Sequence, residues 1–139
     1  MAVEAGKLQL YSDPECRDLV NTAAEYFGVE KDEILFTNGS DEILNFAFML
    51  YGNASGAVFP NISYGFYSVY ADLFTLDSKV VPLKDDFSID VSDYCHNDAT
   101  VVIANPNAPT GIALPISDVE RIVKSNPDNV VVIDEAYVD

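Results

Sequence analysis

Basic residues are scarce in this sequence of 139 residues. It holds 7 lysines and arginines against 23 aspartates and glutamates, which gives a formal net charge of −16. Proteins that bind nucleic acids or anionic membranes present clusters of positive charge to the phosphate groups. The shortage of positive charge therefore argues against both as partners, and we expect the acidic excess to form a solvated surface.

Cysteines and long apolar runs are also few. Cys16 and Cys95 lie far apart with no Cys-x-x-Cys pair, so we predict neither a disulfide framework nor a metal site. The longest apolar stretches, such as 46–51 and 130–133, fall far short of the roughly 18 to 20 residues of a membrane span. Glu4 and Lys7 stand where a signal peptide would be apolar. We therefore expect a cytoplasmic protein.

The hydrophobic content, by contrast, is high enough for a folded core. Hydrophobic residues make up 49% of the chain, and this length suits one domain. Apolar runs that are unbroken and β-branched predict strands, and apolar residues at helical spacing predict helices between them. The predicted strands are 34–36, 57–60, 79–83, 100–104 and 130–133. This alternation predicts an α/β fold, a three-layer αβα sandwich with a mostly parallel sheet.

Several residues predict where the helices begin and end. Asp13 and Pro14 are typical of a helix start, and Gly28 of a helix end. Helices are also expected over 41–51 and 64–74. Ser117 and Glu120 have the spacing of a capping box at the start of a further helix.

Three polar strings follow predicted strands, where open parallel sheets bind their ligands. Residues 37–42 place a glycine turn before a helix, whose N–H groups suit a phosphate; an ordinary helix cap is the alternative. Residues 105–111 contain two prolines and a glycine, which can present asparagine amides to a ligand or simply end a strand.

The third string, 134–137, begins with a carboxylate at the end of a buried strand. Asp134 needs a cation, a metal or a protonated ring nitrogen there, unless it caps the next helix. The string also imitates the metal-binding strand of P-loop ATPases. That interpretation is excluded because the sequence has no Gly-x-x-x-x-Gly-Lys-Ser/Thr motif.

Five motifs in order, 10–16, 38–42, 60–64, 105–111 and 134–137, resemble one family over nearly the whole chain. The chain is similar to the fold type I aminotransferases that depend on pyridoxal phosphate, and among them to the histidinol-phosphate aminotransferases. The resemblance implies transfer of an amino group between L-histidinol phosphate (its keto form being imidazole-acetol phosphate) and glutamate or 2-oxoglutarate. It also implies a homodimer.

The resemblance also implies the cofactor site. Gly39, Ser40 and Asp41 would hold the cofactor phosphate through their backbone N–H groups. Tyr64 would stack on the pyridine ring, and Asp134 would pair with the protonated ring nitrogen. The remaining implied contacts are those of Tyr137 with the 3′ oxygen of the ring and of Tyr11 with the phosphate of the other subunit.

The sequence departs from the family in two places. The family usually has asparagine directly before Pro-Thr-Gly, where this chain has Ala108, so Asn107 is expected to substitute. The lysine that forms the Schiff base would lie beyond Asp139, and Lys79 is expected to be a surface residue. We therefore expect residues 1–139 to be part of the large domain of such an enzyme, without the N-terminal arm, the catalytic lysine region or the small C-terminal domain.

Other functions remain open at this point. An aromatic aminotransferase or a threonine-phosphate decarboxylase would use the same motifs. A catalytically inactive acidic binding module is the alternative from another class.

Overall fold

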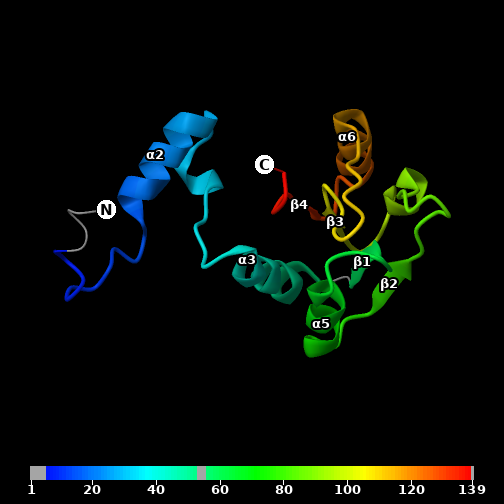
Figure 1. Cartoon of the computed structure of the whole chain (residues 1–139), viewed down its shortest axis with the longest axis horizontal. Coiled ribbons are helices and arrows are strands. Elements are labelled where there is room, and N and C mark those ends of the chain that lie inside the picture. Colours follow the sequence, from blue (N-terminus) through cyan, green and yellow to red (C-terminus); the bar gives the residue numbers. More distant parts are fainter. Residues whose placement is uncertain (1–5, 53–55, 139) are drawn as a thin grey trace. The chain divides into compact units, whose positions relative to one another are not determined.

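Four parallel strands form the central sheet of the computed structural model (Figure 1). They follow the order β2-β1-β3-β4, and every neighbouring pair is parallel. Their bounds are β1 Ala57–Pro60, β2 Ser78–Val81, β3 Thr100–Ala104 and β4 Val131–Asp134. Unbroken apolar sequences suit this arrangement because parallel strands are covered on both faces. Four of the five predicted strands are thus confirmed.

The structure describes residues 6–52 and 56–138, and the chain divides into two units, 1–37 and 38–139. The first unit contains α2 (Arg17–Phe27) and the short 3-10 helix η1 (Lys31–Glu33). The sheet and the remaining helices belong to the second unit.

Helices cover both faces of the sheet in the second unit. One face packs against α3 (Ser40–Ala47), the π-helical turn η2 (Phe48–Gly52) and α5 (Phe66–Leu73). The other face packs against the 3-10 helix η3 (Val91–Tyr94) and α6 (Ile116–Ser125). Successive strand residues alternate between the two cores: in β3, Val102 belongs to the first and Val101 and Ile103 to the second. The predicted three-layer α/β fold is confirmed.

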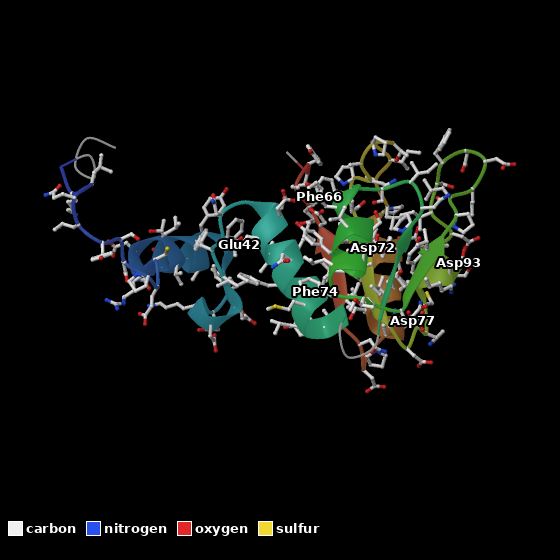
Figure 2. All side chains as sticks on the ribbon, turned by 90° about the horizontal axis from the view of Figure 1, so that it is seen from below. Glu42, Phe66, Asp72, Phe74, Asp77 and Asp93 are labelled. Atoms are coloured by element: carbon white, nitrogen blue, oxygen red, sulfur yellow. The ribbon has the colours of Figure 1, made fainter. Side chains whose placement is uncertain are left out.

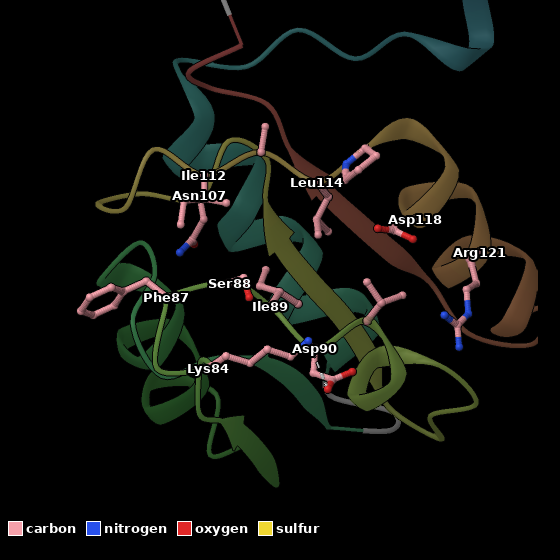
Figure 3. A pocket seen from close by; sticks show the side chains of 13 residues that line it. Lys84, Phe87, Ser88, Ile89, Asp90, Asn107, Ile112, Leu114, Asp118 and Arg121 are labelled. Carbon is pink, nitrogen blue, oxygen red and sulfur yellow. Dashed lines mark ion pairs between the residues drawn. The ribbon is translucent and has the colours of Figure 1, made fainter.

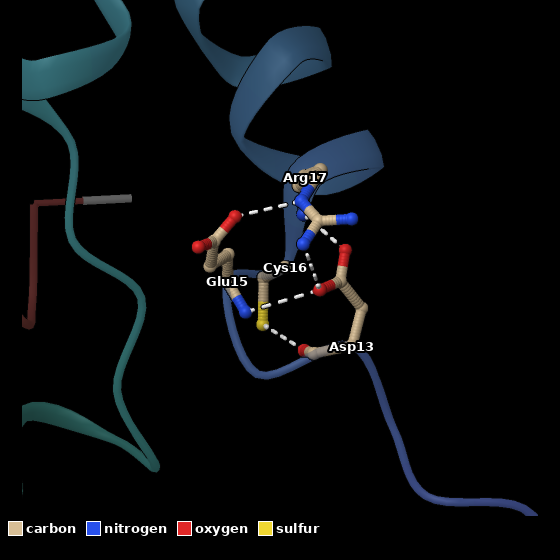
Figure 4. Close-up of polar contacts among 4 residues, drawn as sticks. All are labelled: Asp13, Glu15, Cys16 and Arg17. Atoms are coloured by element: carbon tan, nitrogen blue, oxygen red, sulfur yellow. Dashed lines mark hydrogen bonds and ion pairs between the residues drawn. The ribbon is translucent and has the colours of Figure 1, made fainter.

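The start of α2 differs from the prediction (Figure 4). The helix begins at Arg17, because Cys16 has a left-handed backbone conformation with a φ of 47°. Asp13 lies ahead of the helix, where its carboxylate accepts the N–H groups of Glu15 (3.2 Å) and Arg17 (3.1 Å). These bonds to Arg17 and Glu15 lower the pKa of Asp13. The predicted helix end is confirmed, since Gly28 caps α2 with a φ of 68°.

The strand predicted at 34–36 is wrong. These residues have no regular structure, and Leu35 is 67% exposed. An apolar run becomes a strand only when a neighbour accepts its backbone hydrogen bonds, and none of the described strands pairs with this segment. The sequence shows the apolar run and not the neighbour.

The predicted capping box of α6 is also wrong. The helix begins at Ile116 with Pro115 as its N-cap, so Ser117 already lies inside the first turn. Glu120 accepts from Lys124 at 2.6 Å instead of turning back to the helix start. Pro115, with a φ of −59°, precedes Ser117 by two residues, so the helix begins two residues earlier than a serine N-cap would place it.

Among the residues that the structure describes, Tyr94 has a buried hydroxyl without a hydrogen-bond partner. Burial raises the pKa of this phenol well above its ordinary value. Because a buried hydroxyl without a partner costs about 1–3 kcal/mol, Tyr94→Phe is expected to leave stability unchanged or raise it by about 1 kcal/mol. Urea unfolding would measure this. A loss above about 1 kcal/mol would show that the hydroxyl does have a partner.

Large apolar side chains remain exposed along η2 and α5 of the second unit (Figure 2). Leu50 is 60%, Phe66 46% and Leu73 64% exposed. Exposed apolar patches of this kind favour association. We expect the isolated 139-residue chain to bind a hydrophobic dye or to self-associate, as fluorescence and light scattering would show. A dye-free monomer with a sharp cooperative melt would contradict this.

Candidate functional site

A small cavity of about 50 Å³ lies where several polar loops of the second unit meet. It is bordered by the ends of β3 and β4 and by the first residue of α3, in keeping with the rule that open α/β sheets bind ligands outside the carboxyl ends of their strands. Its lining residues are Ser40, Tyr64, Ala104, Ala108, Asp134, Ala136 and Tyr137. Four of the residues predicted from the sequence are therefore brought together here: Ser40, Tyr64, Asp134 and Tyr137.

The N-terminus of α3 forms one side of the site. Gly39 is its N-cap with a φ of 82°, a conformation that favours glycine. Ser40 and Asp41 then open the helix, whose first N–H groups have no acceptor within the helix and lie at its positive end. Glu42 accepts the N–H of Asn38 at 2.7 Å, which fixes the approach to the helix. An anionic group is the ligand that suits this end.

The carboxylate of Asp134 brings a negatively charged group to the same cavity, in contrast to the positive end of α3. Its Oδ1 accepts the N–H of Ala136 at 3.2 Å, and its Oδ2 accepts the hydroxyl of Tyr67 at 2.7 Å. Among the described residues, no lysine or arginine forms an ion pair with Asp134. A half-buried carboxylate without a cation favours a positively charged ligand atom beside it.

Tyr67 was not predicted as a site residue. It is 1% exposed, and burial together with its hydrogen bond to Asp134 raises the pKa of its phenol far above the ordinary value. The phenol therefore stays protonated and donates. Its signal in the sequence is faint: tyrosines recur at three-residue spacing in 64–70, which places them near one face of a helix.

The two tyrosines of the cavity differ in how firmly they are held. The hydroxyl of Tyr64 donates to Asp41 Oδ1 at 2.7 Å, and this bond raises the pKa of Tyr64 to about 12. Tyr64 is half-buried and packs at 5.7 Å, edge to face, against Tyr67. Tyr137 is 66% exposed. Both present aromatic surface to a flat ligand.

Asn107 does not line this cavity, contrary to the role expected from the sequence. It is 2% exposed, and its amide N–H groups donate to the carbonyl of Ile62 (2.9 Å) and the hydroxyl of Thr110 (3.2 Å). Its side-chain carbonyl accepts from Ser63 at 2.8 Å. These bonds hold two loops together, while Ala108 lies at the cavity. Buried amides satisfy their hydrogen bonds within the protein, so the side chain of Asn107 stabilises the conformation of its loop.

A larger cavity of about 360 Å³ lies elsewhere in the second unit (Figure 3). It lies beside an ion pair between Lys84 and Asp90 at 3.4 Å, and Asp118 and Arg121 also line it. Asn107 is the one predicted site residue on its wall. Because its charges are mixed, it does not favour one class of ligand.

Gly39 and Asp41, also predicted from the sequence, flank Ser40 at the N-terminus of α3, as the N-cap and the second residue of the helix. Tyr11 belongs to the first unit, where its side chain is fully exposed. Lys79 is exposed on β2, as expected of a surface residue. Across residues 6–52 and 56–138, no group of histidine, cysteine and acidic side chains is arranged to hold a metal ion. In the same part of the chain, no helix is long and apolar enough to cross a bilayer.

Two curated proteins that are similar in sequence to this chain carry the same name. The chain is 50% identical over 133 residues to a histidinol-phosphate aminotransferase of Brachyspira hyodysenteriae, covering 95% of this chain and 38% of that protein. It is 49% identical over 142 residues to the corresponding enzyme of a Marinomonas species, covering all of this chain and 40% of that protein. The chain thus spans about two-fifths of the length of these relatives.

A solved structure has the same fold. The histidinol-phosphate aminotransferase of Sinorhizobium meliloti, determined in complex with pyridoxal-5′-phosphate, superposes with a TM-score of 0.85 and 26% identity, over 99% of this chain and 39% of that one. The sequence model of aminotransferase class I and II matches residues 2–139. The chain therefore belongs to the class I and II aminotransferase family.

Proposed function

We propose that this chain is part of a histidinol-phosphate aminotransferase that uses pyridoxal 5′-phosphate. One observation carries the proposal: a carboxylate without a cation, Asp134, and the N-terminus of α3 border the same small cavity. They suit the two ends of a ligand that has a protonated ring nitrogen and a phosphate. The names of the curated relatives support the substrate assignment.

The residues at the cavity fit this cofactor. The N–H groups of Gly39, Ser40 and Asp41 would hold its phosphate, which an α-helix N-terminus stabilises. Asp134 would hold the proton on the ring nitrogen, and Tyr64 would cover one ring face. Tyr137 would donate to the 3′ oxygen. Asn107 would act indirectly, by holding the loop that carries Ala108 to the cavity.

These residues would orient the cofactor and adjust its charge. When bound, pyridoxal phosphate supplies an electron sink for the negative charge that forms as an amino acid loses its α-proton. Asp134 makes that sink stronger by keeping the ring nitrogen protonated. Tyr67 keeps the carboxylate in place, and Tyr64 stays a neutral donor because its pKa is raised to about 12.

The wider setting follows from the same proposal. Residues 1–139 would be part of the large domain of a longer enzyme, which supplies the catalytic lysine and the groups that bind the substrate. That enzyme would be a cytoplasmic homodimer, in which Tyr11 reaches the cofactor phosphate of the other subunit. Its substrates would be L-histidinol phosphate with 2-oxoglutarate, and imidazole-acetol phosphate with glutamate in the reverse direction.

Substrate competition in the complete protein tests this function. The purified enzyme, loaded with pyridoxal phosphate, is given L-histidinol phosphate, phenylalanine or threonine phosphate, each with 2-oxoglutarate. We expect glutamate to form fastest with L-histidinol phosphate. Preferred turnover of phenylalanine would indicate an aromatic aminotransferase, and release of CO₂ from threonine phosphate a decarboxylase. Absence of turnover with all three would overturn the enzymatic function.

A further inference from the structure

We propose that Tyr67 is a positioning residue of this site: its hydroxyl holds the Asp134 carboxylate in the orientation that receives the cofactor ring. This inference rests on the proposed function. Its basis is the 2.7 Å bond from the Tyr67 hydroxyl to Asp134 Oδ2, which joins α5 to the end of β4. Tyr67 itself does not line the cavity, so it would act through Asp134.

The ring of Tyr67 is fixed on several sides. It stacks on Phe48 with ring centroids 6.1 Å apart, and it meets Phe59 and Tyr64 edge to face at 6.0 and 5.7 Å. With 1% of its surface exposed, the side chain has no room to change rotamer. A donor held in this way defines where its acceptor must lie.

Asp134 needs such a partner because its own strand gives little support. All four residues of β4 are only partly buried, whereas every residue of β3 is buried. The Asp134 side chain has two held oxygens, one on the N–H of Ala136 and one on Tyr67. An ionised carboxylate has about four acceptor positions, so these bonds leave capacity for a ligand proton. Holding both oxygens before the ligand arrives lowers the ordering cost of binding.

The same segment also holds the other end of the site. Tyr64 donates to the Asp41 carboxylate at 2.7 Å, and Tyr70 donates to the Asp41 backbone carbonyl at 3.0 Å. Residues 64–70 thus connect the first turn of α3 to the carboxylate at the end of β4. Of these three tyrosines, Tyr67 is the one that donates to the carboxylate of Asp134.

Binding of pyridoxamine phosphate to the complete protein tests the role of Tyr67. This probe carries the ring and the phosphate and needs no covalent bond to a lysine. Its dissociation constant is measured for wild type, Tyr67→Phe, Asp134→Ala and the double variant. Tyr67→Phe is expected to weaken binding about tenfold, the size typical of a hydrogen bond to a charged group. In the Asp134→Ala background the same change is expected to weaken binding less than about twofold, because no carboxylate is left to position.

Tyr94→Phe is the matched control, since it removes a buried phenol hydroxyl that contacts no site residue. It is expected to leave the dissociation constant unchanged. Placing p-aminophenylalanine at position 67 of the wild-type background returns a donor and is expected to restore most of the affinity. If Tyr67→Phe folds poorly, the p-aminophenylalanine variant still tests whether a donor at position 67 supports binding.

The outcomes separate the two proposals. Unchanged binding in Tyr67→Phe, or an equal loss with and without Asp134, overturns the positioning role alone. If Asp134→Ala binds pyridoxamine phosphate as tightly as wild type, the proposed cofactor site is wrong and the positioning role falls with it.

Discussion

Asp134→Asn in the complete enzyme is expected to lower the turnover number on the order of 100-fold or more while leaving the cofactor bound. Asparagine keeps the shape of the side chain and one oxygen that can accept from Tyr67, although its NH₂ group cannot accept the N–H of Ala136. The principal loss is the negative charge. An amide does not keep the ring nitrogen protonated, so the negative charge that forms on the substrate is less well stabilised.

Single-turnover rates of amino-acid conversion, measured beside the cofactor stoichiometry, test both parts of this expectation. Glu135→Gln is the matched control: the same chemical change is made at an exposed neighbour that does not line the cavity. Its rate should match wild type. A near-normal rate in Asp134→Asn would reduce Asp134 to a structural residue that binds the Ala136 N–H.

Phe48→Ala is expected to lower the free energy of unfolding by about 3–5 kcal/mol, the range for an aromatic side chain deleted from a packed core. Phe48 is 1% exposed, and its ring contacts the rings of Phe59, Tyr67 and Tyr70 at centroid distances of 5.5–6.2 Å. The deletion would leave a cavity beneath the site. Because Tyr67 loses its stacking partner, the hold on Asp134 should loosen as well.

Urea unfolding of the complete protein would measure this loss. Phe87→Ala provides the comparison, since it deletes the same side chain where it is 53% exposed, and it should cost less than about 1 kcal/mol. Equal losses at the two positions would show that the core around Phe48 does not limit stability.

The strands were the most predictable part of this fold. β1 and β3 have the predicted bounds because their apolar residues are covered on both faces, which leaves an unbroken run in the sequence. The run at 34–36 looks similar, but none of the strands described in the structure pairs with it. The start of α2 was misplaced because the left-handed conformation of Cys16 leaves no mark in residue type.

The site was predictable where position along a strand decides it. Asp134 ends a strand and Ser40 opens a helix, so simple topology brings them to one cavity. Tyr67 escaped prediction because its partner lies 67 residues away, and no local pattern reports such a bond. Asn107 was misjudged for a related reason: nothing near it in the sequence shows that the Ile62 carbonyl would take its amide proton.

The place of β4 in the sheet has a further consequence for hydrogen exchange. β3 lies between β1 and β4 and is buried throughout, whereas among the described strands β4 pairs with β3 alone and is half-buried along its length. In the 139-residue chain, backbone amides of β3 should therefore exchange slowest, and those of β4 much sooner, through local opening. Each such opening carries Asp134 away from Tyr67, so the carboxylate would leave its position while the rest of the sheet is still folded.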